Sequence, residues 1–435
     1  MEKEKDQAGN SAISRRKFLG SAAALSAFFI VPRHVLGGVG YLAPSDKITM
    51  GWIGAGRQGL YLQGAFLKTN EAQLVAVADV YKTKVDNFIN ITNKFYADAG
   101  QQSTYKGCTG YNNFTELLNR KDIDAVVIAT PDHWHAAVAV RAAAAGKDIY
   151  CEKPLSLTVK EGRAMADAVR KYKRVFQTGS MQRSSGEFRQ AVELIRNGYL
   201  GQIKNVKVSI GGPPVPYNLP EETLPEGLDW NLWLGPNEYV HYNRLLDPMI
   251  GDSAWGKWRD FKGLGGGDMT DWGAHMFDIV QWALDMDGTG PVSVNPPDAD
   301  HQFLTYTYAN GIVMTHENFG KPHSIQFNGT EGTLEIQRQK LVTTPASLAT
   351  KTIGGNDKRV YFSDNHYKDF LDAIRKRSKP IADIETGHRS ATVCNIGNIA
   401  YELGVPLKWD PAKERFDNDK ANALLGRAMK KEWAV

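Results

Sequence analysis

One lysine stands where a charged side chain could act on a small molecule. Lys153 lies in the stretch YCEKPLSL, directly after an apolar run that is typical of a buried strand ending near Cys151. An ammonium group at that point can donate a hydrogen bond to a hydroxyl and stabilise negative charge that develops on its oxygen. For an isolated lysine, the competing interpretation of a side chain that extends from a loop to solvent would prevail.

An aspartate and a histidine supply the second chemical group. Asp271 and His275 are four residues apart in GGGDMTDWGAHMFDIVQWAL, a spacing that places them on one face of a helix. A carboxylate beside a histidine can fix its tautomer and orient it as a proton acceptor, as the oxidation of an alcohol requires. A structural Asp–His pair at a buried helix is equally consistent with this spacing. Asp278, one turn further on, is interpreted as structural.

A glycine turn at residues 54–59, GAGRQG, matches the dinucleotide-binding fingerprint. The first glycine permits a tight turn, the second lets the backbone approach a pyrophosphate, and the third lets helix and strand pack closely. The helix that follows would offer unpaired amide groups and a positive dipole end to phosphate. We therefore expect cofactor contacts from Gly54, Gly56, Arg57, Gln58 and Gly59.

The choice between the two nicotinamide dinucleotides depends on Asp79. This residue ends the second apolar run, where an acidic side chain accepts hydrogen bonds from the ribose hydroxyls. Its charge would repel a 2′-phosphate, so the sequence favours NAD over NADP. Arg57 and Lys82 argue the other way, because either could pair with that phosphate.

The loop ATPDHWH, residues 129–135, follows another apolar run and is expected to form a wall of the cofactor crevice. His133 and His135 could alternatively make hydrogen bonds at a helix start. Two histidines without a third convincing ligand do not make a metal site, and the three widely spaced cysteines suggest neither metal ligation nor a disulfide framework. The expected cofactor contacts on this side are Thr130, Pro131, His135, Glu152 and Lys153.

Strands that alternate with helices organise the first part of the chain. This alternation predicts parallel strands joined by right-handed crossovers. We expect an N-terminal Rossmann dinucleotide-binding domain at residues 46–179, with Lys153 at the strand edge that borders its crevice. Helical segments separate the apolar strand-like runs, which lie at residues 48–53, 74–80, 125–130, 148–153 and 174–179.

The pattern changes after Gly179 to alternating apolar and polar residues, which is typical of half-exposed strands. Residues 301–319 predict a hairpin with an Asn310-Gly311 turn, and residues 324–336 predict a second one. Residues 180–435 are therefore expected to form an α+β domain with a mostly antiparallel open sheet. Its helices are expected near residues 186–197, 271–284, 365–376 and 388–403.

The N-terminus carries an export-like leader. SRRKFLG, residues 14–20, contains a twin arginine and overlaps an Ala-rich apolar run from Phe18 to Val31. This run is short for a membrane span, which needs about 20 apolar residues, and is typical of the hydrophobic region of a signal peptide. Residues 1–37 resemble a twin-arginine (Tat) signal, which predicts export to the periplasm. An uncleaved leader that anchors the protein in a membrane is the alternative.

Composition fits a soluble globular protein. The 435 residues are 42% hydrophobic and 23% charged, with a formal net charge of +4. No basic stripe with interleaved aromatic residues occurs, so nucleic acid is not an expected partner. No stable membrane span is expected once the leader is removed.

Together these motifs resemble the glucose–fructose oxidoreductase, inositol dehydrogenase and rhizopine-catabolism (Gfo/Idh/MocA) family. The resemblance rests on GWIGAGRQG, VVIATPDHWH, AAAAGKDIYCEKPLSLTVKEG, GGGDMTDWGAHMFDIVQWAL and GTEGTLEI, and covers nearly the whole chain after the leader. It implies an NAD(P)-dependent oxidoreductase whose open C-terminal sheet faces the cofactor and often mediates oligomers, here a dimer or tetramer. It also implies that Lys153, Asp271 and His275 form the catalytic set, with His275 as general base and the other two assisting and orienting.

The resemblance further implies a small-molecule carbohydrate substrate, since family members act mostly on sugars, cyclitols and their derivatives. Six of the ten tryptophans lie between Trp230 and Trp282, and we expect one or two near the substrate because aromatic faces stack on sugar rings. The Trp-rich insertion at residues 228–258 departs from the shortest family members and favours a glycoside. Weaker candidates for substrate contacts are Gln182, Arg183, Arg189 and Trp272.

Three functions are consistent with these features. The first is oxidation or reduction of a hydroxyl of a sugar, glycoside or cyclitol by hydride transfer; an exported enzyme would need a tightly bound NAD that is regenerated in place. The second is a redox-neutral, NAD-dependent glycosidase that oxidises a ring hydroxyl, eliminates the aglycone, adds water and returns the hydride. The third, a non-catalytic sugar sensor, is disfavoured by the intact Lys153, Asp271 and His275.

Overall fold

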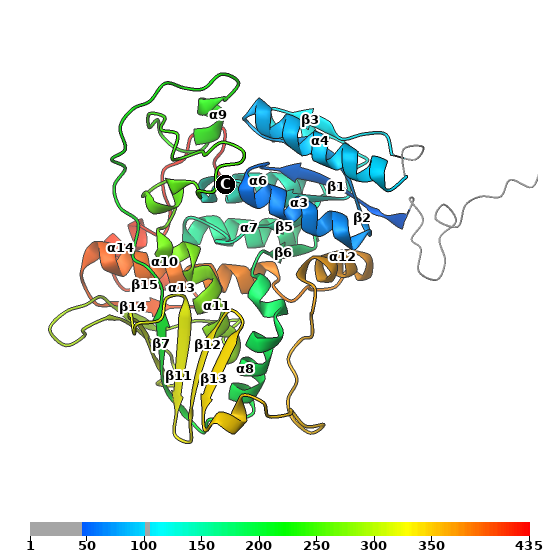
Figure 1. Cartoon of the computed structure of the whole chain (residues 1–435). Coiled ribbons are helices and arrows are strands. Elements are labelled where there is room, and N and C mark those ends of the chain that lie inside the picture. Colours follow the sequence, from blue (N-terminus) through cyan, green and yellow to red (C-terminus); the bar gives the residue numbers. More distant parts are fainter. Residues whose placement is uncertain (1–45, 101–104) are drawn as a thin grey trace, which may run out of the picture. The chain divides into compact units, whose positions relative to one another are not determined.

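A computed structural model describes residues 46–100 and 105–435 of the chain (Figure 1). The predicted leader at residues 1–37 lies outside this part. Within Ile48–Val435, which form one unit, a parallel sheet with flanking helices is followed by a larger, mostly antiparallel sheet. The fold class predicted from the sequence is confirmed.

Six parallel strands form the N-terminal sheet, in the order β3-β2-β1-β4-β5-β6. The order reverses between β1 and β4, and ligands of such sheets bind at the carboxyl ends of the strands beside this switch point. The strands are β1 (Ile48–Ile53), β2 (Ala72–Ala78), β3 (Thr109–Tyr111), β4 (Ala125–Ile128), β5 (Asp148–Cys151) and β6 (Phe176–Thr178). The helices between them are α3 (Arg57–Thr69), α4 (Lys82–Asp98), α5 (Phe114–Leu118), α6 (Asp132–Ala144) and α7 (Val159–Lys171).

Nine strands form the second sheet, in the order β13-β12-β11-β7-β10-β9-β8-β14-β15. Both predicted hairpins are confirmed: β9 pairs antiparallel with β10, and β11 with β12. Only the β7–β10 pair is parallel among the described strands of this sheet. The strands are β7 (Ile203–Ser209), β8 (Ser293–Asn295), β9 (Leu304–Thr307), β10 (Val313–His316), β11 (Ser324–Gly329), β12 (Thr333–Gln337), β13 (Lys340–Thr344), β14 (Leu407–Asp410) and β15 (Arg415–Phe416).

Helices of the C-terminal region pack against both sheets. α8, α11 and α13 pack on the antiparallel sheet and enclose its apolar core, whereas α12 packs on α3 and α13 also packs on α7 of the Rossmann part. These contacts fix the second sheet against the crevice of the first. The α-helices are α8 (Gly186–Arg196), α9 (Trp230–Leu234), α10 (Asp268–Asp271), α11 (Gly273–Ala283), α12 (His366–Lys376), α13 (Ile384–Leu403) and α14 (Asp419–Ala423), and the 3₁₀ helices are η2 (Met181–Ser184), η3 (Lys257–Asp260) and η4 (Ala346–Leu348).

The helix predicted at residues 271–284 is interrupted. α10 ends at Asp271 and α11 begins at Gly273, with Trp272 between them. Asp271 and His275 therefore do not share one continuous helix, and the expected single helical face is wrong.

A long connection, residues 213–262, leaves the second sheet and crosses to the Rossmann part; we call it the excursion. In Figure 1 it is the green chain that rises to α9. Leu228 bridges Tyr81, and the amide of Asp229 donates to the carbonyl of Val80 at 2.9 Å. Three of its tryptophans pack into a small core of their own with Tyr81 of the Rossmann part; they are Trp230, Trp233 and Trp258. The excursion is thus an ordered wall fastened to the end of β2.

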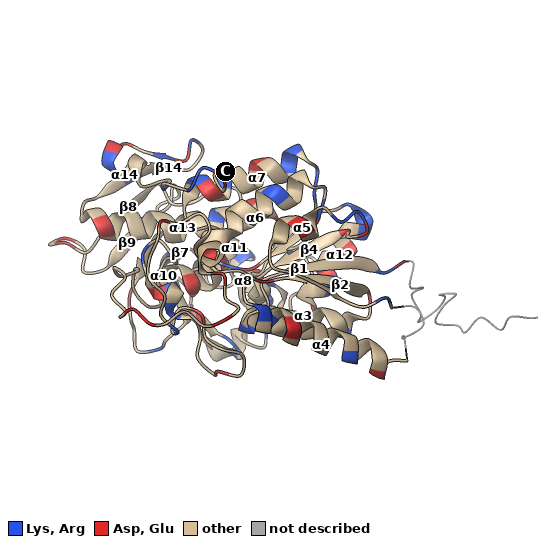
Figure 2. Cartoon of the chain, turned by 90° about the horizontal axis from the view of Figure 1, so that it is seen from above, with Lys and Arg blue, Asp and Glu red and all other residues tan. Residues whose placement is uncertain are grey.

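The surface carries both charge signs. Basic and acidic residues are interspersed along surface helices such as α4 (Figure 2). In the described part of the chain, no helix combines the length and apolarity needed to cross a membrane. The cysteines Cys108, Cys151 and Cys394 are buried free thiols.

Candidate active site

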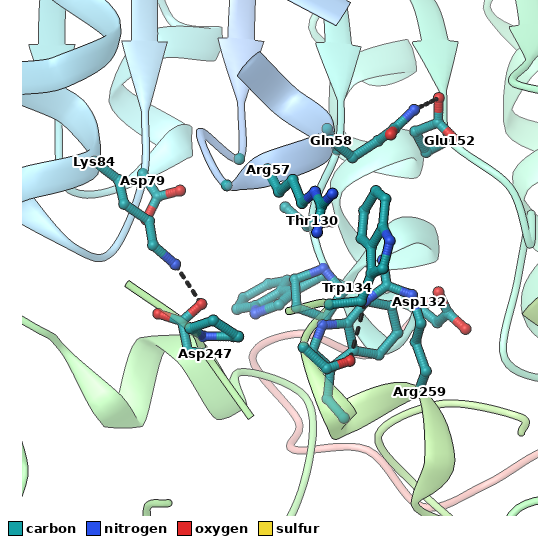
Figure 3. A pocket seen from close by; sticks show the side chains of 18 of the residues that line it. Arg57, Gln58, Asp79, Lys84, Thr130, Asp132, Trp134, Glu152, Asp247 and Arg259 are labelled. Carbon is teal, nitrogen blue, oxygen red and sulfur yellow. Dashed lines mark hydrogen bonds and ion pairs between the residues drawn. The ribbon is translucent and has the colours of Figure 1, made fainter. Parts of the chain in front are cut away.

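A cavity of about 1070 Å³ runs along the carboxyl ends of the Rossmann strands. Its walls come from the glycine turn, from the loops after β2, β4 and β5, from the excursion and from the start of α11. Figure 3 places Asp79 and Lys84 toward one end and Asp132 and Glu152 toward the other. The predicted catalytic residues Lys153, Asp271 and His275 all line this same cavity.

The glycine turn has the geometry that a dinucleotide needs. Gly54 has φ +95°, and a Cβ there would lie 2.6 Å from the backbone of Ala129; a Cβ on Gly59 would lie 2.2 Å from the carbonyl oxygen of Gly54. Gly56, by contrast, has open space at its Cβ position and is the N-cap of α3, where no side chain caps the helix. Free amide groups at this helix start fit a pyrophosphate. The turn therefore fits the NAD-type cofactor that the sequence predicted.

Asp79 lines the cavity beside the glycine turn, where the sequence predicts the adenosine ribose. Its Oδ2 accepts from the amide of Ala55 at 2.6 Å, and its Oδ1 accepts from the amide of Tyr81 at 2.9 Å. Burial raises the pKa of Asp79, although the nearby Lys84 acts in the opposite direction. Lys84 also pairs with Asp247 of the excursion. Lys82, which the sequence offered as a phosphate partner, is instead exposed and pairs with Asp86.

Replacing Asp79 by Ala should relax the preference for NAD. The change removes the charge that repels a 2′-phosphate, while the nearby Lys84 stays paired with Asp247. We expect the ratio of NADP to NAD affinities to rise about tenfold or more, because a hydrogen bond to a charged group contributes about 1.5–3 kcal/mol. Calorimetric titration of both dinucleotides measures this ratio.

Two further variants control that experiment. Asp79→Asn keeps an acceptor for the amide of Ala55 and separates loss of charge from loss of the turn. Asp98→Ala removes an exposed carboxylate at the far end of the same helix, where it pairs with Lys94, and should leave the ratio unchanged. An unaltered ratio of NADP to NAD affinities in both Asp79 variants would show that Asp79 does not bind the ribose.

The loops after β4 and β5 form the opposite part of the cofactor wall. Gln58 Nε2 donates to Glu152 Oε1 at 3.0 Å, and the amide of Lys153 donates to Glu152 Oε2 at 3.2 Å. Thr130 and Pro131 line the cavity, and the Thr130 hydroxyl is buried without a hydrogen-bond partner. These predicted cofactor residues are brought together as expected.

Lys153 meets Asp271 across the cavity. Its Nζ donates to Asp271 Oδ1 at 2.6 Å and to the Asp271 carbonyl at 2.9 Å. Arg259 of the excursion approaches the same carboxylate at 3.5 Å. Burial by itself raises the pKa of Asp271, but the two cations outweigh it and hold the pKa below its ordinary value. Since an ammonium has three hydrogens, Lys153 keeps one donor for a ligand.

His275 is paired with an arginine, not with Asp271. Arg338 Nη2 lies 3.0 Å from His275 Nε2, and a guanidinium can only donate. Nε2 is therefore the acceptor and Nδ1 carries the proton; Nδ1 is buried without a partner. Burial, with Lys153 and Arg338 adding to it, lowers the pKa of His275 well below 6.5. The expected Asp271–His275 hydrogen bond is wrong, but the neutral, proton-accepting imidazole is present.

Several other predicted site residues lie elsewhere. His135 is buried with Nδ1 2.8 Å from the Pro154 carbonyl and Nε2 3.0 Å from the Thr130 carbonyl, so it braces two loops from behind the cavity wall. Gln182 reaches the site only through Arg338, whose Nε donates to Gln182 Oε1 at 3.0 Å. These two predictions of direct contact are wrong because the side chains are used by protein groups.

Arg183 and Arg189 also lie away from the cavity. Arg183 is buried in ion pairs with Asp278 at 2.8 Å and Asp287 at 2.8 Å, which confirms the structural role expected for Asp278. Arg189 packs over the ring of Phe362 at 4.4 Å. Neither arginine is placed to touch a ligand in the crevice.

Of the tryptophans that line the cavity, Trp255 and Trp272 are the two that are not buried. Trp272 lines it and stacks on His323 with ring centroids 3.6 Å apart. Trp255 is exposed, with the guanidiniums of Arg57 and Arg259 at 4.5 and 5.0 Å from its ring centroid. Trp282, in contrast, belongs to the C-terminal core.

Asp132, the first residue of α6, is an acid that the sequence did not single out. It lines the cavity, is 3% exposed, and its Oδ1 has no hydrogen-bond partner. Burial raises the pKa of Asp132 to about 8; Asp271 and Glu152 act in the same direction, and Arg259 and Lys153 oppose them. A buried acid without a partner is costly to fold and available for proton transfer.

Replacing Asp132 by Asn should stabilise the cofactor-free protein in a pH-dependent way. The acid has a pKa of about 8 when folded and about 3.8 as an isolated side chain, so its ionisation opposes folding increasingly from pH 4 to 8. The stabilisation should vanish near pH 4 and be largest at pH 8, with an upper limit on the order of 5 kcal/mol. Denaturant unfolding at pH 4.5, 6 and 8 measures it. Equal effects at all three pH values, or a matching trend in the exposed control Asp86→Asn, would contradict it.

The fold and cavity define a two-domain nicotinamide-dependent oxidoreductase. A dinucleotide-binding turn on a parallel sheet shares one cavity with a lysine and a neutral histidine from the two parts of the chain. The chain belongs to the Gfo/Idh/MocA oxidoreductase family: residues 48–180 match its NAD-binding Rossmann fold, and residues 214–435 match its C-terminal alpha/beta domain.

Similar proteins agree with this assignment. The uncharacterized oxidoreductase YrbE of Bacillus subtilis is 23% identical over 83% of this chain and 97% of its own length. A glycosyl hydrolase family 109 protein of Shewanella putrefaciens is 28% identical over 44% of each chain. The fold resembles that of levoglucosan dehydrogenase in complex with NADH and levoglucosan, with a TM-score of 0.55 and 18% identity over 83% of this chain and 99% of that one.

Proposed function

We propose that the protein oxidises a hydroxyl of a sugar, glycoside or cyclitol by using a bound NAD. The observation that carries this proposal is the convergence of Lys153 and His275 on the cavity that begins at the glycine turn. The sugar ligand of levoglucosan dehydrogenase, a protein of similar fold, supports a carbohydrate substrate. Asp79 supports NAD over NADP.

The chain supplies a donor and a proton acceptor for this reaction. Bound nicotinamide would take a hydride from the carbinol carbon. The remaining donor of Lys153 binds the substrate oxygen and stabilises its negative charge, while Asp271 holds the ammonium in place. His275 Nε2, unprotonated at neutral pH, takes the hydroxyl proton.

A second candidate is the redox-neutral glycosidase, which Asp132 favours. After oxidation, the carboxylate form of Asp132 would take the proton from the carbon next to the new carbonyl and pass it to the departing aglycone oxygen. The same group would take a proton from the water that adds, and return one to carbon, before hydride returns to the sugar. The family 109 relative supports this route by its printed name, although the match covers 44% of that protein.

A panel assay separates these functions. The purified protein is first examined for bound nicotinamide by absorbance and fluorescence and is then mixed with sugars, cyclitols and chromogenic glycosides. Accumulation of NADH supports oxidation, and release of the aglycone without net NADH supports the redox-neutral route. Binding without either signal would instead indicate a sensor and overturn both.

We also propose that the leader exports the protein and that the excursion retains its cofactor. Residues 14–20 carry the twin arginine. The excursion would cover the adenosine end of a bound dinucleotide, because Asp247 pairs with Lys84 and the Ser253 carbonyl accepts a hydrogen bond from Arg57. Cell fractionation of the wild type and of an Arg15→Lys, Arg16→Lys variant tests export. Loss of the periplasmic protein in the variant is the expected result.

A further inference from the structure

Arg338 is a cation in the cavity without an anionic partner. It sits in the turn between β12 and β13, lines the cavity and is accessible to solvent. Its hydrogen bonds go to two neutral acceptors, Gln182 Oε1 at 3.0 Å and His275 Nε2 at 3.0 Å. Within the described chain it forms no ion pair with a carboxylate. Arg338 is exposed, so solvent satisfies its charge until a ligand with an acidic group arrives.

The other cations near Arg338, unlike Arg338 itself, are paired with a carboxylate. Lys153 and Arg259 share the carboxylate of Asp271. Burial raises the pKa of Asp132 to about 8, which reduces its negative charge at neutral pH. Three cations therefore face the single carboxylate of Asp271 at this end of the cavity, and Arg338 is the one that forms no ion pair with it.

The arginine is also held in a fixed orientation. Its guanidinium lies 4.6 Å from the centroid of the Trp272 ring, and its Nε and Nη2 are fixed by Gln182 and His275. A guanidinium fixed in this way loses little entropy when it binds a planar or tetrahedral oxyanion. This is a positioned group, unlike a surface arginine that samples many rotamers.

We propose that Arg338 forms an anion subsite beside the base and that the substrate is an acidic sugar, carrying a carboxylate or phosphoryl group. This proposal rests on the proposed oxidation of a carbohydrate and names its substrate class. An anion is a stronger acceptor for the guanidinium than a neutral imidazole. The acidic group replaces the contact of Arg338 Nη2 with His275 Nε2, while Nε keeps its bond to Gln182 and the guanidinium stays against Trp272. His275 Nε2 then becomes free to take the hydroxyl proton.

Matched sugars test the subsite on the full-length protein with its cofactor. Calorimetric titrations compare glucose, glucuronate, galacturonate and glucose 6-phosphate. We expect an acidic sugar to bind about tenfold or more tightly than glucose, as charge-assisted hydrogen bonds allow. Arg338→Met should abolish this preference, and Arg338→Lys should retain part of it. Lys340→Met, which removes an exposed cation from the same hairpin, should leave the preference unchanged.

The outcomes separate this proposal from the proposed function. Equal or undetectable binding of neutral and acidic sugars by the wild type, or a preference that survives in Arg338→Met, would overturn the subsite. A preference for glucose 6-phosphate over both uronates supports the subsite and identifies a phosphoryl group; the reverse order identifies a carboxylate. If the preference is present but no carbohydrate is turned over, the oxidation is contradicted while the subsite stands.

Discussion

Lys153→Met should abolish turnover while the protein keeps its dinucleotide. The ammonium is 2.6 Å from Asp271 Oδ1 and is the group placed to stabilise charge on the reacting oxygen. Loss of one such donor costs about 10²–10³ in rate, and here the change also leaves Asp271 facing Arg259 alone. We expect kcat to fall by at least this factor, measured by NADH formation or aglycone release on a substrate that the panel identifies.

The cofactor readout makes this prediction specific. Methionine keeps the length and apolar volume of the lysine, so the cavity should not collapse. Bound nicotinamide per protein chain should stay close to the wild-type value, because the phosphate-binding turn is untouched. Lys262→Met, which breaks an exposed pair with Glu402, serves as the matched control and should retain full activity. Loss of NAD binding in the Lys153 variant would show that this side chain holds the cofactor instead.

Local signals in the sequence were sufficient to predict most strands of the Rossmann part. Uninterrupted apolar runs marked the strands that are buried on both faces, and β1 begins and ends at the residues expected, Ile48 and Ile53. The short strand β3 was missed because only three residues pair there and none of them is buried. The break at Trp272 was missed because the helical spacing continues across it.

The functional side chains were harder to predict than the fold. Lys153, Asp271 and His275 could be predicted as one set because their motifs are contiguous in sequence and resemble a known family. Their partners are not: Arg338 comes from a hairpin turn and Arg259 from the excursion. Pairing between residues so far apart depends on how the second sheet is set against the first, which no local pattern records.

The same limit explains the wrong assignments among the polar residues. Arg183 looked available because an arginine after a strand end can face a ligand, but the carboxylates of Asp278 and Asp287 come from a distant helix and the loop after it. Lys84 could have been suspected, since it lies in the first turn of the helix that follows Asp79. Asp132 lies in the motif ATPDHWH, but only the structure shows that its Oδ1 has no hydrogen-bond partner.

His275→Asn should lower turnover by about 10²–10⁴-fold, the usual contribution of a positioned general base. Asparagine can still accept a hydrogen bond from Arg338, so the neighbouring side chain keeps its place, but it cannot take up a proton at neutral pH. Substrate binding should change far less than kcat. If His275→Asn kept more than a tenth of the wild-type kcat, another group would have to accept the hydroxyl proton.

The pH profile of the wild-type enzyme tests the same base without a mutation. A general base works when it is unprotonated, so the rate falls as the pH drops through its pKa. Burial and the cations Lys153 and Arg338 lower the pKa of His275 well below 6.5. The rate should therefore hold from pH 8 down to 6.5 and fall only at lower pH. Arg338→Met removes one of these cations, so its rate should begin to fall at a higher pH than the wild-type rate. The residual rate of His275→Asn should show no such fall at low pH. A wild-type rate that is halved at pH 6.5 or above would show that the imidazole is not the buried, uncharged acceptor that its surroundings require.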